Sequence, residues 1–347
     1  MVTSLYTNLE CLLTWISLTT IALNANTTIY ILQLRRLIRV AVAEILFAKS
    51  DFHSHFYGVI RISYYFCNKK IKRMKRMLFC ELCPFTYRLS MEKEILKRHL
   101  RDFFGKTLFA QERTQDLLPV VVYHHKSLIR RRLGNVNMQL QENKATNLAL
   151  AVTHIDGLLI RPGETFSVWK QVGRTTARKG YKEGLTIAKG QPSQGIGGGL
   201  CQLSNLIHWM VLHSELTIAE HHHHDGVDLF PDFGRQIPFG TGTSISYNYI
   251  DYRVKNETSN TYQLRLWVDG EYLCGELRAT ELQPHTFHIH AENEHFTREG
   301  NDVFRNGEVY RDTIDRTTGQ ILESRLIRTN HAKVMYECPP ELLSNKQ

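Results

Sequence analysis

The sequence predicts an α+β protein in which a basic, helical N-terminal part precedes a mixed domain with a largely antiparallel sheet. Apolar residues recur at helical spacing in the first half of the chain, whereas period-2 alternation and turn residues dominate the second half. The chain has 347 residues, of which 42% are apolar and 22% charged, so it can bury a substantial core. A globular protein of one large or two ordinary domains is therefore expected.

Two helices are expected before the middle of the chain. In residues 90–104, Ser90 is a candidate N-cap and acidic residues follow in the first turn. The apolar positions with helical spacing in this segment are Ile95, Leu96, Leu100 and Phe103. We interpret the segment as an amphipathic helix that packs on the next domain, with contact to a membrane surface as the alternative. Residues 141–154 predict a second helix. Its apolar face comprises Leu148, Val152 and Ile155.

Strands and tight turns are expected after the second helix. Pro162-Gly163 is placed for a type II turn, and Asp269-Gly270 for a type I′ turn between two strands. The expected strands cover residues 216–220, 244–249, 262–268 and 271–277, and residues 314–321 predict a further turn between strands. Cys274 falls within the predicted hairpin and is expected to be a small packing residue.

Composition divides the chain into four parts. These are an N-terminal extension (1–73), a basic helical segment (74–135), the α+β domain (136–337) and a C-terminal tail (338–347). The extension has an apolar run at residues 11–23, which is shorter than the roughly 20 residues of a membrane span. No basic residue precedes that run, so a signal peptide is not expected, and Met74 or Met77 is the preferred start. We expect the protein in the cytoplasm or at the inner face of the membrane.

Net charge indicates the kind of partner, and cysteine content indicates the redox compartment. The net charge of +9 favours acidic surfaces such as phospholipid headgroups, anionic wall polymers or nucleic acid. No basic–aromatic platform accompanies this charge, so nucleic acid is not an expected partner. Seven cysteines, an odd and scattered number, favour free thiols in a reducing compartment. Cys80 and Cys83 form a single C-x-x-C, and with no second pair at zinc-ribbon spacing a metal or redox role is not the favoured interpretation.

The candidate functional site begins in the segment "QGIGGGLCQLSNLIHWMVLH", residues 194–213. Four glycines precede Cys201, which stands near the expected start of an amphipathic helix. Unpaired N–H groups and the helix dipole at this position would favour a thiolate and would hold an oxyanion during acyl transfer. The alternative is structural: the glycines let the helix pack tightly, and Cys201 is a small buried residue.

A nucleophilic thiol needs a base, and residues 219–225 ("AEHHHHD") are the preferred source. His208 lies roughly 10 Å from Cys201 along the helix axis and is expected in the core or at an interface. In an extended segment alternate histidines share a side, so that His222 pairs with His224 and His221 with His223. The carboxylates that could orient the base are Asp225, Asp228, Asp232 and Asp251.

Four segments of the chain resemble the VanW family. They are "GIGGGLCQLSNLIHWMVLH", "EHHHHDGVDLFPDFGRQIPFGTGTSISYNYIDYRVKN", "YLCGELR" and "HAKVMYE", and the resemblance covers about residues 77–337. Family members occur beside glycopeptide-resistance genes and as domains of bacterial cell-surface proteins. The resemblance implies an accessory role in vancomycin resistance or envelope biology, with a cell-wall precursor or envelope component as partner.

The resemblance also implies site residues. The family segments Gly-Gly-Gly-x-Cys-Gln and Glu-Arg-His-x-His match Gly197, Gly198, Gly199, Cys201, Gln202, Glu220, His222 and His224. This chain departs from the pattern at His221, which replaces an arginine, and at Gly240-Thr-Gly242, where relatives tend to carry Gly-Arg-Asp. If that aspartate orients a histidine in relatives, its absence weakens the case for a catalytic triad here.

Three functions remain open on the sequence. The first is a thiol-dependent acyl transfer or hydrolysis, with Cys201 as nucleophile, and His222 or His224 as base. The glycines, Gln202 and Glu220 are then binding residues. The second is a non-catalytic module that binds a wall polymer or a partner protein. The third is a zinc site formed by His222, His224 and a thiolate or Asp228; no cofactor is assigned.

Overall fold

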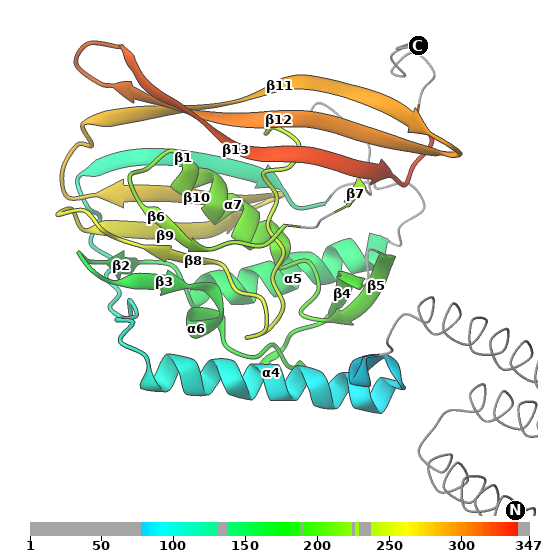
Figure 1. Ribbon diagram of the computed structural model, residues 1–347. Coiled ribbons are helices and arrows are strands. Elements are labelled where there is room, and N and C mark those ends of the chain that lie inside the picture. Colours follow the sequence, from blue (N-terminus) through cyan, green and yellow to red (C-terminus); the bar gives the residue numbers. More distant parts are fainter. Residues whose placement is uncertain (1–77, 131–137, 189–190, 224–225, 229–236, 339–347) are drawn as a thin grey trace, which may run out of the picture. The chain divides into compact units, whose positions relative to one another are not determined.

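The computed structural model describes residues 78–130, 138–188, 191–223, 226–228 and 237–338 (Figure 1). The chain divides into two units, Met1–Leu78 and Phe79–Gln347, and the elements below all belong to the second. The predictions for the N-terminal extension and most of the C-terminal tail therefore lie outside the described residues. Within the described ranges, no helix is both long and apolar enough to cross a membrane.

The second unit begins with a long helix, α4 (Pro84–Phe104), after the short 3-10 helix η1 (Phe79–Glu81). Cys83 is its N-cap residue, and the backbone N–H of Cys83 donates to Oγ1 of Thr86 at 3.0 Å. Pro84 occupies the first helical position, where a missing N–H costs nothing. The helix thus starts six residues before the predicted N-cap at Ser90. That prediction was wrong because Cys83, Pro84 and Thr86 already supply a start.

The central sheet has four antiparallel strands in the order β1-β10-β9-β2. Its strands are β1 (Val120–Leu128), β2 (Leu158–Ile160), β9 (Tyr262–Asp269) and β10 (Tyr272–Ala279). The predicted hairpin is β9–β10, and Cys274 is buried in it as expected. Residues 120–128 were predicted to belong to a helical segment, but they form the strand that extends this hairpin. The run of β-branched residues at the start of β1 favours that outcome.

The turn of the hairpin is of a different type from the one predicted. Asp269 pairs with Tyr272, so the two loop residues are Gly270 and Glu271. Gly270 has a φ of 55°, and Asp269 is not among the residues with positive φ. A glycine with positive φ at the first central position is typical of type II′. By contrast, the type II turn at Pro162-Gly163 is confirmed, since Gly163 has a φ of 82° and the N–H of Glu164 donates to the Arg161 carbonyl.

A second sheet combines three long antiparallel strands with one short parallel strand, in the order β11-β12-β13-β7 (Figure 1). Its strands are β7 (Val227–Asp228), β11 (His285–Glu299), β12 (Asp302–Asp315) and β13 (Ile321–Val334). The predicted turn at residues 314–321 joins β12 to β13. There the side chain of Asp315 accepts hydrogen bonds from the backbone N–H groups of Thr317 and Thr318.

Helix α7 (Cys201–Leu212) lies between the two sheets (Figure 1). One face packs in the main core with the central sheet and with α5 (Met138–Thr153), through Leu203, Leu206, Ile207 and Met210. Trp209 and Leu212 form a second cluster with Ile289 and Val309 of the long strands. The predicted apolar face of the second helix is confirmed, since Leu148, Val152 and Ile155 also belong to the main core. The packing predicted for residues 90–104 is wrong except at Ile95, because Leu96, Leu100 and Phe103 are exposed on α4.

Smaller elements complete the unit. They are β3 (Thr165–Ser167), α6 (Val168–Val172), η2 (Ala177–Lys179), β4 (Glu183–Ala188), β5 (Gln191–Ile196), β6 (Thr217–Glu220) and β8 (Arg253–Lys255). β3, β8 and β6 form a three-stranded sheet, and β4 pairs with β5. The predicted strand at 244–249 does not form. Asn248 has a φ of 45°, and a bridge between Ser246 and Ile250 closes a tight turn there.

Candidate functional site

The glycine-rich loop contacts the protein's own backbone. A Cβ added to Gly198 would lie 2.2 Å from the carbonyl carbon and oxygen of Gly184 in β4. The carbonyl of Gly198 accepts a hydrogen bond from the side chain of Asn147 in α5 at 2.9 Å. Gly197 has a φ of 79°, a conformation that other residues rarely adopt. Close backbone approach is therefore the reason for glycine here, and the neighbour that approaches is β4.

Cys201 is the first residue of α7, as the sequence predicts, but it is partly buried. Burial raises the pKa of the Cys201 thiol, and the smaller opposite effect of the Ile245 N–H does not compensate. The expected stabilisation of a thiolate by the helix terminus is not observed, because removing the sulfur from water penalises the charged form more strongly. The thiol is therefore in its neutral form at physiological pH.

One polar face of α7 is covered by the chain segment 241–245. Cys201, Ser204, Asn205 and His208 share this face through their helical spacing. The N–H and hydroxyl of Thr243 donate to Oδ1 of Asn205 at 2.6 and 2.9 Å, and the same hydroxyl contacts that of Ser204. The segment where this chain departs from the Gly-Arg-Asp pattern thus closes over the helix face that carries the cysteine.

The histidines alternate as predicted, but the pair that faces α7 is the other pair. The ring centroids of His221 and His208 are 4.2 Å apart, and those of His221 and His223 are 4.1 Å apart. His208 itself is buried and bonds through Nδ1 to the hydroxyl of Tyr252 at 3.0 Å, so its predicted core position is confirmed. His222 is directed elsewhere, toward Glu220, whereas His224 lies outside the described residues.

Burial keeps the inward histidines neutral. Desolvation lowers the pKa of His221 to about 4, with a further contribution from His223, and lowers that of His208 well below its ordinary value. Among the described residues, Nε2 of His221 is a buried nitrogen with no hydrogen-bond partner. His221 contacts the far end of the polar face of α7, seven residues from Cys201, so it is not a direct partner of the thiol.

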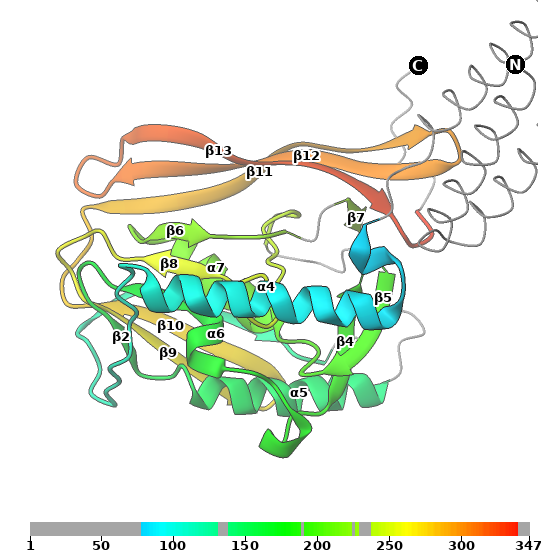
Figure 2. The same cartoon turned by 60° about the horizontal axis from the view of Figure 1, so that its bottom comes forward.

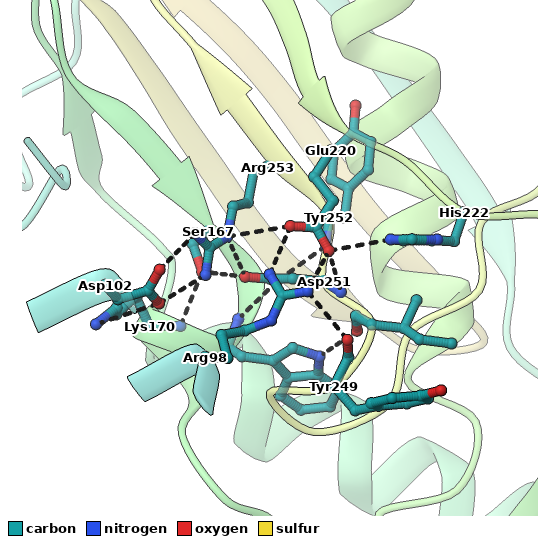
Figure 3. A network of polar contacts seen from close by, with 12 residues as sticks. Arg98, Asp102, Ser167, Lys170, Glu220, His222, Tyr249, Asp251, Tyr252 and Arg253 are labelled. Atoms are coloured by element: carbon teal, nitrogen blue, oxygen red, sulfur yellow. Dashed lines mark hydrogen bonds and ion pairs between the residues drawn. The ribbon is translucent and has the colours of Figure 1, made fainter. Parts of the chain in front are cut away.

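Glu220 joins strand β6 to helix α4 (Figure 3). The guanidinium of Arg98 donates to both carboxylate oxygens, at 2.6 and 2.8 Å. The carboxylate also accepts the backbone N–H of Asp251 at 3.0 Å and lies 3.0 Å from Nε2 of His222. Burial would raise the pKa of Glu220, but these hydrogen bonds and the charge of Arg98 outweigh it and lower the pKa. Glu220 is ionised, and it orients His222.

Comparison with known proteins bears directly on these residues. The family model described as "VanW like protein" matches residues 143–278, which include the glycine-rich loop, α7 and the histidine segment. The Vancomycin B-type resistance protein VanW of Enterococcus faecalis is 34% identical over 266 residues, covering 77% of this chain and 96% of that protein. The chain belongs to the VanW family. The Uncharacterized protein YoaR of Bacillus subtilis is 29% identical over 161 residues, 46% of each protein. No solved structure matches the chain.

The family segments of this VanW-family chain mainly hold its own elements together. The side-chain amide of Gln202 donates to the Ser127 hydroxyl and the Leu128 carbonyl of β1, each at 2.9 Å. With the glycines against β4 and Glu220 bound to α4, these matched residues connect α7 and β6 to their neighbours. His222 differs from them, because 43% of its side chain is exposed.

The aspartates proposed to orient a histidine are engaged elsewhere. Asp251 is fully buried and accepts from the Ser167 hydroxyl at 2.5 Å and from Nε of Arg253 at 2.8 Å. Arg253 in turn makes two hydrogen bonds to Asp102 of α4, at 2.8 and 2.7 Å (Figure 3). Asp228 lies on β7, where it accepts from the Tyr336 hydroxyl. Asp225 and Asp232 lie outside the described residues.

Sequence reasoning missed the α4 residues of this network. Arg98 is 122 positions from Glu220, and Asp102 is 151 positions from Arg253. The one sequence signal for them is that Arg98 and Asp102 are charged residues on the same face of the predicted helix as the apolar Ile95. A zinc site is not supported within the described ranges, where no three His, Cys, Asp or Glu side chains are placed to hold a metal ion.

Proposed function

We propose that this VanW-family chain is a non-catalytic accessory protein of glycopeptide resistance that binds a cell-wall precursor or another envelope component. The observation that carries the proposal is the partly buried thiol of Cys201, whose pKa is raised by desolvation, since a nucleophile must be accessible and ionisable. Similarity to a protein named for vancomycin B-type resistance supports the biological setting. On this view the glycine loop and α7 form a rigid support for a surface that binds.

The surface next to Glu220 is the best candidate for that contact. Arg98 bonds to Glu220 and also donates to the carbonyl of Tyr249 at 3.0 Å, so one ion pair positions both segments. Beside it, the side chain of His222 is 43% exposed, and the residue Tyr249 is 45% exposed. An imidazole and a phenol present flat apolar faces with hydrogen-bonding tips, which suits a peptide or a sugar.

The test compares Cys201→Ser with His222→Ala and Tyr249→Ala. Binding of each purified variant to peptidoglycan sacculi and to a soluble muramyl pentapeptide is measured, together with vancomycin susceptibility of a host that depends on the gene. Cys201→Ser should retain binding and resistance, whereas the two surface variants should weaken both by about tenfold. His331→Ala, with an exposed histidine on β13, is the control. Loss of resistance in Cys201→Ser with an unchanged melting temperature would refute the proposal.

Thiol-dependent acyl transfer or hydrolysis is the second candidate. It is favoured by the position of Cys201 at the start of α7, where the helix terminus presents backbone N–H groups. It requires the segment 241–245 to move from the polar face of α7 so that the thiol becomes accessible. A substrate-dependent increase in alkylation of Cys201 would support this candidate over the binding module.

A further inference from the structure

Helix α4 carries a continuous apolar stripe on the side that faces away from the rest of the unit. The stripe comprises Phe85, Leu89, Leu96, Leu100 and Phe103. These positions are spaced by three, four and seven residues and therefore lie on one face of the helix. Each side chain is at least 49% exposed, and Phe103 reaches 79%. Figure 2 shows α4 at the front of the unit, with the sheets and the helices α5, α6 and α7 behind it.

The opposite face of the helix is fixed to the domain. Ile95 is buried, Arg98 bonds to Glu220 and Asp102 bonds to Arg253. These three positions are separated by three and four residues, so they define the inward face. Since two ion pairs hold that face, the apolar stripe cannot turn inward without breaking them. Its exposure is a consequence of how the helix is anchored.

Positive charge accompanies the stripe. Lys93, Lys97 and Arg101 follow one another at intervals of four residues and form a row along one flank. Lys93 and Lys97 both lie near Glu94, at 3.0 and 3.9 Å, so one carboxylate faces two ammonium groups. Helix α4 itself contains five Lys and Arg against three Asp and Glu, and residues 69–76, earlier in the sequence, contain six Lys and Arg with no Asp or Glu.

We propose that α4 docks on an anionic phospholipid surface, with its apolar stripe inserted between the headgroups and its basic row on the lipid phosphates. Aromatic and leucine side chains on one face with lysine and arginine beside them are the pattern of helices that lie in the membrane interface. A neutral protein partner would use the stripe but leave the concentration of positive charge unexplained. Each basic residue near an anionic surface adds to the attraction, which salt weakens. The proposal does not depend on whether the VanW domain binds or reacts.

The test is co-sedimentation of the full-length protein with vesicles. We expect binding to vesicles of phosphatidylglycerol and phosphatidylcholine, much weaker binding to phosphatidylcholine alone, and a reduction when salt is raised. The double variant Leu100→Ser/Phe103→Ser should lower the partition coefficient by at least about tenfold. The matched control is Leu322→Ser/Leu326→Ser, which removes two exposed leucines from β13 and should bind like the wild type.

A second measurement locates the stripe itself. Phe103→Trp should gain a fluorescence signal that brominated lipids quench, beyond the quenching of the wild-type tryptophans. Equal vesicle binding by Leu100→Ser/Phe103→Ser and the wild type would overturn the proposal. A wild-type dimer that this variant converts to a monomer, without lipid binding, would assign the face to a second copy instead. A melting temperature lowered by the same substitutions would mean that another part of the chain covers the stripe, which also contradicts docking on lipid.

Discussion

At the residue scale, two cysteines at helix starts have opposite environments. Cys83 precedes α4 and is exposed, and the backbone N–H of Thr86 lowers the pKa of its thiol. Cys201 begins α7 under the segment 241–245, and burial raises the pKa of its thiol. A helix N-terminus therefore activates a thiol only where water still reaches the sulfur.

This contrast predicts the order in which the thiols react. In the folded protein at pH 8, iodoacetamide should modify Cys83 faster than Cys201 by about tenfold or more, because Cys201 is partly covered and its thiol pKa is raised. Rates are obtained by quenching samples over time and quantifying the cysteine peptides by mass spectrometry. In denaturing urea the two rates should converge. Equal rates in the native protein would contradict the partial burial of Cys201 and favour the thiol-dependent candidate.

The sequence could identify the residues of the motif but not their surroundings. Position and spacing were sufficient to predict that Cys201 starts a helix, that His208 is buried and that the histidines alternate. Which pair turns inward depends on the register of β6 against β8, and the pKa of Cys201 depends on a segment some forty residues later. These contacts are non-local, and no periodicity along the chain encodes them.

At the element scale, the sequence predicted elements correctly where the residues that determine them are close together in the chain. The hairpin β9–β10 and the turn at Pro162-Gly163 were predicted because the residues that require unusual backbone angles stand next to each other. Residues 120–128 were assigned to the helical segment, yet they pair with β10, which lies about 150 positions away. The strand is stabilised by a partner that the local sequence does not contain.

The packing of the glycine loop on β4 predicts a large effect of a small substitution. Gly198→Ala should lower the free energy of unfolding by about 3 kcal/mol or more, because its Cβ would overlap the backbone of Gly184 and β4 has to move. Gly195→Ala, near the end of β5, is the matched control. Its Cβ would meet Thr186 at an ordinary 3.5 Å, so a cost of about 1 kcal/mol or less is expected. Urea unfolding measures both. Similar costs for the two variants would show that the loop is not packed as described.

The attachment of α4 can be measured through the Arg98–Glu220 pair. The side chains are only 12% and 19% exposed, so removing one partner leaves a poorly solvated charge. Glu220→Gln or Arg98→Met should each cost about 3 kcal/mol, and the double variant less than the sum of the two. Arg161→Met breaks the exposed pair with Glu112, and it should cost about 1 kcal/mol at most. Additive costs for Arg98 and Glu220 would mean that the two residues do not interact.

At the scale of the whole molecule, α7 connects the two hydrophobic clusters of the unit. Its apolar faces join the main core to the cluster beneath the long strands, and its third face carries polar groups that the loop 241–245 and the histidines cover. Most residues of α7 are buried, so the histidines packed on the helix or at its end have little contact with water. Desolvation lowers the pKa of His221 and of His213, at the end of the same helix, to about 4.

This burial predicts how stability depends on pH. The folded-state pKa values of His213 and His221 lie below the ordinary 6.5, so between pH 6.5 and 4 the unfolded chain binds more protons. The free energy of unfolding should therefore fall as the pH is lowered from 7 to 5, by up to about 1.4 kcal/mol per pH unit for each such histidine.

His221→Phe keeps an aromatic ring in place and removes the titration, so the decline of its free energy of unfolding should be shallower than that of the wild type. His124→Phe alters an exposed ring and should retain the wild-type slope. Urea unfolding at intervals of half a pH unit provides the measurement. A slope for His221→Phe as steep as that of the wild type would show that the stacked histidines at α7 are not held neutral by burial.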